Sequence, residues 1–482
     1  MRRNFVVSLV FGLALSASAS AGTVTQLAHQ PPEGSIITML MTDGTVLAQG
    51  FSQTGWWKLT PDNMGSYVNG TWTQVASLPS GYAPDAMAES VLPDGKLIIA
   101  GGEYNFGSFA FTNQSALYDP FKNKWTDVTP DKHLLNFIGD SGSNVLPDGR
   151  FLVAKKFSKG MYAFDSKTMT WSKLKSKGKD ESFNSEEGLQ LLPDGSYLVV
   201  EVKGHPKTQR YVPSSGQWVD AGSTPVDLRG PQNCCGHCIP YGPKDKCYDP
   251  PGETGASALL PNGTVFFSGS IPEGENTAHT AIYNIAQNKW TKGPDIPNGD
   301  EAFDTGVSAL PNGNALVEGY NGTFYEFDGT KLVTQSGSGS FGGDCMTNLP
   351  SGEILVGGFE VYKPAGTYQA AWQPAITDVP ASVTRGQTYK ITGKQFNGIS
   401  QGSSFGDEFD SHSNYPLVRI TNNSSHHVFY ARTHDHSTMG VATGTKSVFT
   451  NFDVPSGMET GASKIEVVAN GIPSAPVNIT VN

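Results

Sequence analysis

A four-residue turn motif recurs seven times along this chain of 482 residues. The copies are MTDG at 41–44, LPDG at 92–95, 146–149 and 192–195, LPNG at 260–263 and 310–313, and LPSG at 349–352. Proline followed by Asp or Asn and then Gly is typical of tight turns between antiparallel strands. A repeat of roughly forty to fifty residues is typical of propellers and solenoids. The motif therefore restricts the chain to a repeated β-architecture.

The segments beside each turn indicate what one repeat contains. A β-rich run follows the turn, as in KLIIAGG at 96–102 and EILVGGF at 353–359. Most repeats then carry an aromatic residue and a tryptophan, as in ALYDPFKNKWTDV at 116–128. Each repeat is therefore predicted to be a four-stranded blade whose tryptophan packs between blades. Seven repeats predict a seven-bladed kelch-like β-propeller over 22–374, with residues after Gly22 supplying the outer strand that closes the ring.

The pattern changes after Trp372, where alternating strands replace the repeat. This alternation over 375–482 predicts an immunoglobulin-like β-sandwich, so the predicted fold class is all-β. The gap between Gly195 and Gly263 is longer than the other spacings. It predicts an insertion at about 224–252 on one face of the propeller.

Four of the five cysteines lie in this insertion: Cys234, Cys235, Cys238 and Cys247. In an oxidising compartment they would form two disulfides that pin the loop. A zinc site that also uses His237 is the alternative, because clustered Cys and His suit tetrahedral coordination. The remaining Cys345 is predicted to be a buried unpaired thiol, with a redox role as the alternative.

Residues 1–21 have the pattern of a secretory signal, with Arg2 and Arg3 before an apolar stretch and small residues at the end. They predict a secreted, extracellular or periplasmic protein without a membrane span. The formal charge of the chain is −11, and loss of the two arginines makes it −13. This acidic balance argues against a nucleic acid partner. The sequence shows no phosphate-binding loop or dinucleotide fingerprint, so no nucleotide cofactor is expected.

Six repeats place a carboxylate six to eight residues before the proline of the turn, and the first repeat has Ser35 there. The six are Asp85, Asp140, Glu186, Glu253, Asp304 and Asp344. Inner strands line a propeller's channel, so these side chains are predicted to converge at one mouth of it. They could be a solvated polar rim, a calcium site, or an acid and base pair for catalysis.

A second candidate site lies at 431–437, ARTHDHS, where His434 and His436 flank Asp435. On a strand both histidines would point to one face and the aspartate to the other. Two imidazoles near carboxylates suit zinc, copper or iron. The alternative is a polar turn whose histidines bond to local backbone. Three other histidines nearby are predicted to be surface residues: His412, His426 and His427.

Taken together, these features resemble the galactose oxidase and glyoxal oxidase family of copper radical oxidases. The kelch-like repeats and the closing segment SKIEVVANGIPSAPVNITV, 463–481, carry the resemblance. It implies a sandwich loop that enters the propeller axis and delivers a histidine to copper, for which His434 and His426 are the candidates. It also implies a Tyr-His pair on the last blade, but Gly342-Gly343 stands at that position and the sequence contains no Tyr-His dipeptide.

The predicted function is therefore that of a carbohydrate-associated protein without a complete copper radical site, which binds a glycan or another extracellular ligand at the channel mouth. The alternative is a metal-dependent oxidoreductase or carbohydrate-active enzyme that uses His434, His436 and the carboxylates with one copper, zinc or calcium ion. A third possibility is a docking platform for a protein partner. Some aromatic side chains could stack on sugar rings, with packing between blades as the alternative: Trp56, Trp57, Tyr104 and Phe106.

Overall fold

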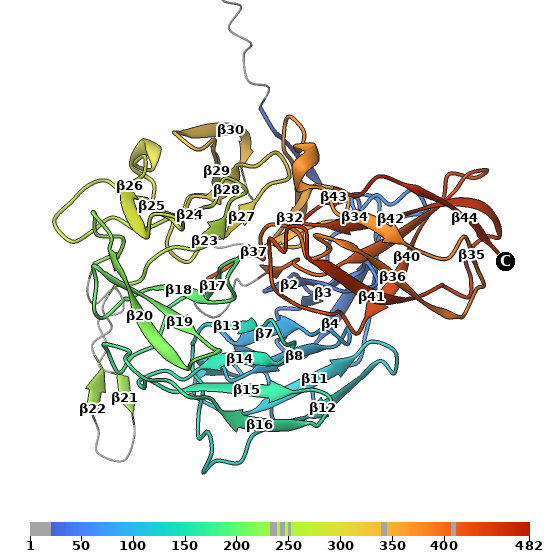
Figure 1. Cartoon of the computed structure of the whole chain (residues 1–482). Helices are drawn as coiled ribbons and strands as arrows, with labels where there is room; N and C mark the ends of the chain where they lie inside the picture. The colour runs from blue at the N-terminus through green and yellow to red at the C-terminus, as the bar shows by residue number, and fades with distance from the viewer. Residues whose placement is uncertain (1–20, 232–238, 242–245, 249–251, 339–344, 406–410) are drawn as a thin grey trace, which may run out of the picture.

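The computed structural model describes residues 21–231, 239–241, 246–248, 252–338, 345–405 and 411–482 (Figure 1). These residues form seven four-stranded antiparallel sheets between 23 and 363, and one nine-stranded sheet between 375 and 481. Two 3₁₀ helices, Pro297–Gly299 and Ala370–Trp372, are the helical elements of the described chain. The fold is all-β and propeller-like. No helix in these residues has the length and apolarity needed to cross a lipid bilayer.

Each four-stranded sheet runs from an inner strand near a common centre to an outer strand (Figure 1). The first two sheets contain β2 (Thr38–Leu40), β3 (Val46–Gln49), β4 (Trp56–Thr60) and β5 (Thr71–Gln74), then β7 (Ala88–Val91), β8 (Leu97–Ala100), β11 (Ser115–Asp119) and β12 (Lys124–Asp127). The next two contain β13 (Ser143–Val145), β14 (Phe151–Ala154), β15 (Met161–Asp165) and β16 (Thr170–Lys173), then β17 (Gln190–Leu191), β18 (Tyr197–Val200), β19 (Lys207–Val212) and β20 (Gln217–Ser223). The fifth and sixth contain β23 (Ser257–Leu259), β24 (Thr264–Phe267), β25 (Ala281–Asn284) and β26 (Lys289–Lys292), then β27 (Val307–Ala309), β28 (Ala315–Glu318), β29 (Thr323–Phe327) and β30 (Leu332–Ser338). The last contains β31 (Met346–Asn348), β32 (Ile354–Val356), β33 (Glu360–Lys363) and β1 (Thr23–Gln26).

The N-terminal strand β1 completes the last sheet, because Thr23 pairs with Lys363 and Gln26 with Glu360 in antiparallel register. The two ends of the seven-sheet region are therefore joined by backbone hydrogen bonds. This pairing confirms the prediction that residues after Gly22 supply an outer strand. It also covers an edge of β33 that would otherwise be open.

The seven turn motifs each connect an inner strand to the second strand of its sheet. Their glycines all have φ between 75° and 94°, a left-handed conformation that favours glycine. In one of them the Gly95 amide donates to the Leu92 carbonyl at 2.8 Å, and Asp94 Oδ1 accepts from the Lys96 amide at 3.2 Å. The aspartate therefore stabilises the turn that the glycine permits.

The predicted tryptophans join neighbouring sheets. Trp125 Nε1 on β12 donates to the carbonyl of Ala76, just beyond β5, at 2.8 Å. Trp171 on β16 makes the equivalent bond to Val128, just beyond β12, at 2.6 Å. Each bond satisfies a partly buried indole and fixes one sheet against the next. These contacts confirm the predicted packing of tryptophans between repeats.

The C-terminal sheet has the strand order β34 (Ala375–Asp378), β36 (Thr388–Lys394), β41 (Ser447–Asp453), β40 (Val428–His434), β39 (Leu417–Asn422), β42 (Gly461–Ala469), β44 (Val477–Val481) and β35 (Ser382–Val383), and β43 (Ile472–Pro473) pairs with β42. Both halves of this order contribute to one core, which includes Ile391 and Phe452 from one half and Val418 and Ile465 from the other. The sheet therefore folds over on itself around a shared apolar interior.

This C-terminal unit packs against the end of the seven sheets that carries the Asp-Gly turns. The Thr433 amide donates to the Thr42 carbonyl at 3.0 Å, and the Met439 amide donates to the Pro147 carbonyl at 3.2 Å. Thr42 and Pro147 both belong to turn motifs. The opposite end of the seven sheets, where the inner strands begin, is the end at which the predicted carboxylates lie.

Three small sheets complete the strands of the described residues. β6 (Pro84–Asp85), β9 (Tyr104–Asn105) and β10 (Ser108–Phe109) form a small sheet, and β21 (Ile239–Tyr241) pairs with β22 (Lys246–Tyr248) inside the predicted insertion. A last hairpin, β37 (Gly402–Ser403) and β38 (Ser411–His412), belongs in sequence to the C-terminal unit. It lies at the centre of the seven sheets and contacts their inner strands β2, β7, β23, β27 and β31 (Figure 1).

Candidate functional site

The predicted carboxylates lie where the inner strands begin, and several of them are close enough to act on one another. Burial raises the pKa of Glu253 and Asp304, and the charge of Asp140 raises both further, although the three belong to three different repeats. Asp344 lies outside the described residues. The structure therefore brings carboxyl side chains that are more than a hundred residues apart in sequence into one cluster, which we call the carboxylate group.

A buried ion pair lies at the centre of this group. Lys156 Nζ bonds to Asp140 Oδ2 and lies 3.3 Å from Glu103 Oε1, and both the lysine and Asp140 are almost inaccessible to solvent. Burial lowers the pKa of Lys156, but the carboxylates of Asp140 and Glu103 raise it more, so the ammonium stays charged. Burial and the nearby Asp140 raise the pKa of Glu103 to about 7. Sequence reasoning missed Glu103 and Lys156, because neither occupies the repeated position.

Glu253 and Asp304 form a second pair, linked by a side-chain hydrogen bond. Burial and the charge of Asp304 raise the pKa of Glu253 to about 9. Burial also raises the pKa of Asp304. Glu253 therefore carries a proton at neutral pH and donates it to Asp304, since two adjacent carboxylates cannot both be ionised at low cost.

The two remaining described members differ in their surroundings. Asp85 Oδ2 accepts from Gln53 Nε2 at 3.0 Å, and Oδ1 accepts from the Ala86 amide at 3.1 Å. Its pKa is raised by burial. Glu186 contributes to the electrostatic stabilisation of Lys156 and has φ 54°. A left-handed glutamate is an uncommon, strained conformation of the kind often found at functional sites.

A row of aromatic side chains borders these carboxylates, and we call it the aromatic strip. Its members are Tyr104, Phe109, Phe111, Phe137, Phe157 and Phe183. Ring centroids of Phe109 and Phe111 are 4.7 Å apart, and those of Phe111 and Phe157 are 5.6 Å apart. Lys156 Nζ lies 4.7 Å from the Phe111 centroid, so the strip and the carboxylates share this lysine.

The outer end of the strip is open to solvent. Tyr104 is 38% exposed and Phe109 is 41% exposed, and the neighbouring Phe106 is 57% exposed. Of the other aromatics considered from sequence, Trp56 is fully buried and packs on Trp125, with ring centroids 5.0 Å apart. Trp56 is therefore a core residue, whereas Tyr104 and Phe106 belong to the surface near the carboxylates.

The central hairpin fills the channel between the inner strands with small polar side chains. Gln401 Oε1 accepts from the Leu191 amide at 2.7 Å and from Asn144 Nδ2 at 3.0 Å. Ser404 exchanges backbone hydrogen bonds with Ser257 at 2.8 and 3.0 Å. The hairpin region is thus bonded to inner strands β13, β17 and β23. It is the segment of the C-terminal unit that enters the axis.

The prediction that His412 is a surface residue is wrong. His412 is 1% exposed and lies on this hairpin, with Nδ1 3.2 Å from Ser90 Oγ on inner strand β7. Burial lowers the pKa of His412 to about 4, so the imidazole is neutral. The missed signal is the run of serine and glycine around 400–413, since only small polar side chains fit a narrow channel between backbones. His426 is exposed, as predicted.

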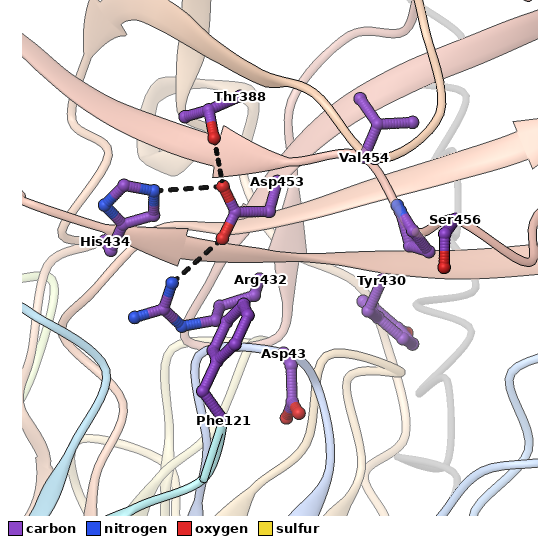
Figure 2. A pocket seen from close by; sticks show the side chains of 11 residues that line it. Asp43, Phe121, Thr388, Tyr430, Arg432, His434, Asp453, Val454 and Ser456 are labelled. Atoms are coloured by element: carbon purple, nitrogen blue, oxygen red, sulfur yellow. Dashed lines mark hydrogen bonds and ion pairs between the residues drawn. The ribbon is translucent and has the colours of Figure 1, made fainter.

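His434 and His436 occupy the C-terminal unit on the turn side of the seven sheets. His434 Nε2 lies 3.2 Å from Asp453 Oδ1 (Figure 2). His434 Nδ1 lies 2.7 Å from Asp435 Oδ2. Asp453 also bonds to Arg432 Nη1 at 2.9 Å and to Thr388 Oγ1 at 2.6 Å. His434, Asp453, Arg432 and Thr388 line a pocket of about 660 Å³ at the junction with the seven sheets, together with Phe121 and Asp43 (Figure 2).

His436 has a different environment from His434. It is half-buried, its Nδ1 lies 2.8 Å from Thr450 Oγ1, and its ring stacks on Tyr415 with centroids 6.3 Å apart. Burial lowers its pKa to about 3. Strand β40 ends at His434, and Asp435 has φ 53°, so strand alternation does not continue to His436. The structure brings neither histidine to the carboxylate group.

No group of three or more His, Cys, Asp and Glu side chains within the described residues is arranged to hold a metal ion. The predicted metal ion therefore stays a prediction. The predicted disulfide residues Cys234, Cys235 and Cys238 lie outside the described residues, as does the side chain of Cys247. Cys345 is a free, buried thiol as predicted, and burial raises its pKa to about 12.

Comparisons with known proteins give similarity only among solved structures. No protein-family model matches the sequence, and no curated protein matches it. The chain is similar to a selenomethionine-substituted virginiamycin B lyase from Staphylococcus aureus, with 12% identity over 72% of this chain and 99% of that chain and a TM-score of 0.46. It is also similar to YjhT, with 17% identity over 64% of this chain and 99% of that chain and a TM-score of 0.41.

Proposed function

We propose that the chain is a secreted glycan-binding protein of galactose oxidase-like architecture that lacks a complete copper radical site. In this proposal residues 22–374 form a closed seven-bladed propeller and residues 375–482 an immunoglobulin-like sandwich. The seven four-stranded sheets and the pairing of β1 with β33 support the propeller. The single core shared by both halves of the C-terminal sheet supports the sandwich.

The observation that carries the binding function is the contact between the aromatic strip and the carboxylate group. A sugar ring has an apolar face, which stacks on an aromatic ring, and a rim of hydroxyls, which need hydrogen-bond partners. Exposed Tyr104 and Phe109 supply the first, and neighbouring Glu103 supplies the second. The glycan would therefore lie at the end of the channel where the inner strands begin.

The protonation states of the group suit polyhydroxyl ligands. Glu253, with its pKa raised to about 9, is protonated and donates to Asp304, and its carbonyl oxygen and the other carboxyls can accept hydrogen bonds from a ligand. Hydroxyl groups both donate and accept, so a mixed set of partners is complementary to them. Water would be displaced from both the aromatic and the polar surface.

Binding by the mature chain to a panel of oligosaccharides tests this proposal. The Tyr104→Ala, Phe109→Ala double variant should lose at least about tenfold in affinity, because stacking on aromatic rings is removed. Phe121→Ala is the matched control, since Phe121 is 67% exposed and lies at the junction with the C-terminal unit. Equal losses in both variants, or no binding to any oligosaccharide, would contradict the proposal.

The Glu253–Asp304 pair favours a second candidate, a carbohydrate-active enzyme. Two carboxyls of unequal protonation are the arrangement that divides general acid and base roles. Glu253→Gln should then abolish turnover of a bound glycan while leaving its affinity within about threefold. Turnover that persists in this variant would exclude Glu253 as the acid, and turnover that needs added metal would favour the metal-dependent alternative.

A further inference from the structure

We propose that the glycan bound at this site carries free amino groups, so that protonated amines of an amino sugar bind to the carboxylate group and the aromatic strip. This inference rests on the proposed glycan-binding function and specifies its ligand. Three features of the described residues support it: the charge of the group, its surplus of acceptors, and the way the aromatic rings already hold ammonium groups.

The first feature is an excess of negative charge. Among the described residues the group contains five carboxyls that act on one another or on Lys156: Glu103, Asp140, Glu186, Glu253 and Asp304. Lys156 Nζ is bonded to Asp140 and lies 3.3 Å from Glu103. Even with Glu253 and Glu103 protonated at pH 6, three further carboxyls of the group face the ammonium of Lys156. A cationic ligand is therefore attracted, and an acidic sugar is repelled.

The second feature is a shortage of hydrogen-bond donors. Asp140 is fully buried and its Oδ2 is bonded to Lys156, but no described residue donates to Oδ1. An unpartnered buried carboxylate oxygen is costly, because it has lost water without gaining a partner. Among the described residues, Glu253 and Asp304 also have few donors near them, and they share a proton in one hydrogen bond. An ammonium group brings three donors and no acceptor, which is the complement of such a group.

The third feature is the geometry of the aromatic strip. Lys156 Nζ lies 4.7 Å from the ring centroid of Phe111 and 5.4 Å from that of Phe157. Lys155 Nζ lies 4.5 Å from the centroid of Phe137. These distances are those of cation–π contacts, in which the electron-rich face of a ring attracts a cation. The strip therefore already binds ammonium groups of the chain itself, and its exposed end offers further ring faces beside the carboxylates.

An amino sugar combines the two chemistries that the site offers. Its ring face can stack on the exposed aromatics, and its amine can reach the carboxylates at their border. Acetylation of the amine keeps the ring and removes the charge. The acetylated sugar is therefore the natural comparison, and the salt dependence of binding isolates the electrostatic part of any difference.

Calorimetric titration of the full mature chain at pH 6 tests the inference with three probes: a glucosamine tetramer, an N-acetylglucosamine tetramer and a galacturonate tetramer. The glucosamine tetramer should bind at least tenfold more tightly than the acetylated one, and the acidic tetramer should not bind detectably. Raising the salt concentration from 20 to about 200 mM should weaken glucosamine binding several-fold, because added salt screens charge. Binding of the acetylated tetramer should change by less than twofold.

Variants separate this inference from the proposed function. Glu186→Gln with Asp304→Asn should reduce glucosamine affinity about tenfold and leave binding of the acetylated tetramer unchanged. Asp148→Asn is the control, since Asp148 is an exposed turn residue on the opposite end of the sheets. Equal, salt-independent affinity for both tetramers in the unaltered chain would overturn the inference while leaving glycan binding intact. Failure of every oligosaccharide to bind would overturn both, and the salt series needs no variant to fold.

Discussion

Nδ1 of His412 lies 3.2 Å from Oγ of Ser90, so a residue of the C-terminal unit bonds to β7, an inner strand of the seven sheets. Both side chains are buried. On the same hairpin, Ser411 Oγ bonds to Thr347 Oγ1 at 3.0 Å on inner strand β31. The hairpin therefore stabilises the seven sheets from inside the channel. The seven sheets and the C-terminal unit should unfold together.

Removing the His412 side chain should destabilise the whole chain. His412→Ala leaves a cavity in the channel and a buried Ser90 hydroxyl without this partner, which together cost on the order of 2–4 kcal/mol. Urea denaturation followed by tryptophan fluorescence measures the change. His133→Ala, at an exposed position, should change the free energy of unfolding by less than about 0.5 kcal/mol. Equal midpoints for the two variants would contradict the role of the hairpin.

Acid should destabilise the fold through two imidazoles whose pKa values are lowered, one buried and one half-buried. The pKa values of His412 and His436 are lowered to about 4 and about 3 by burial, whereas both titrate near 6.5 when unfolded. The unfolded chain therefore binds more protons than the folded chain below pH 6.5, and stability falls as the pH drops from about 6.5 toward 4. Unfolding midpoints at pH 7, 6, 5 and 4 measure this slope. It should be shallower in His412→Asn, which cannot be protonated there.

The turn motifs made most of the seven-sheet region predictable, because the residues of each motif determine its local conformation. Pro, Asp and Gly fix a tight turn at 92–95 whatever the distant contacts are, and a β-rich run follows it. The carboxylates were also predictable as a group, since Asp140 and Asp304 occupy equivalent positions in different repeats. A repeated fold converts an equivalent sequence position into an equivalent position in space.

The contacts between repeats and between units were not predictable in the same way. Lys156 bonds to Asp140 from a loop between two strands, and no local pattern marks that loop as facing the group. His412 and His434 are both polar residues in polar surroundings, yet one is in the channel and the other beside Asp453. Which loop enters the channel depends on the packing of the whole C-terminal unit against the turns, and sequence spacing contains no measure of that.

The left-handed turn glycines give a local test of the fold. Gly95 has φ 80°, and a Cβ there would lie 2.7 Å from Thr42 Oγ1. Gly95→Ala should therefore lower stability by roughly 1–2 kcal/mol through backbone strain and crowding. Gly457→Ala is the control, because a Cβ at that position would meet no atom within 4 Å. Thermal unfolding of the two variants should show the loss in Gly95→Ala alone.

A buried lysine between two glutamates makes the opposite pH prediction from the histidines. Lys179 Nζ lies 2.8 Å from Glu187 Oε2 and 2.8 Å from Glu201 Oε1, and all three side chains are excluded from solvent. One ammonium cannot neutralise two carboxylates. Burial therefore raises the pKa of Glu187 to about 8, even though Lys179 lowers it. Glu187 is thus protonated in the folded chain at neutral pH.

The stability that comes from this proton is fully present below about pH 4.5, where the unfolded glutamate is also protonated, and is lost as the pH rises through about 8. The loss should be on the order of 3 kcal/mol between pH 5 and 9. Glu187→Gln keeps the shape without the titration, so its unfolding midpoint should depend less on pH over this range. Lys179→Met leaves the glutamates without a cation and should cost about 3–5 kcal/mol at pH 8. Identical pH profiles for Glu187→Gln and the unaltered chain would show that Glu187 does not hold its proton there.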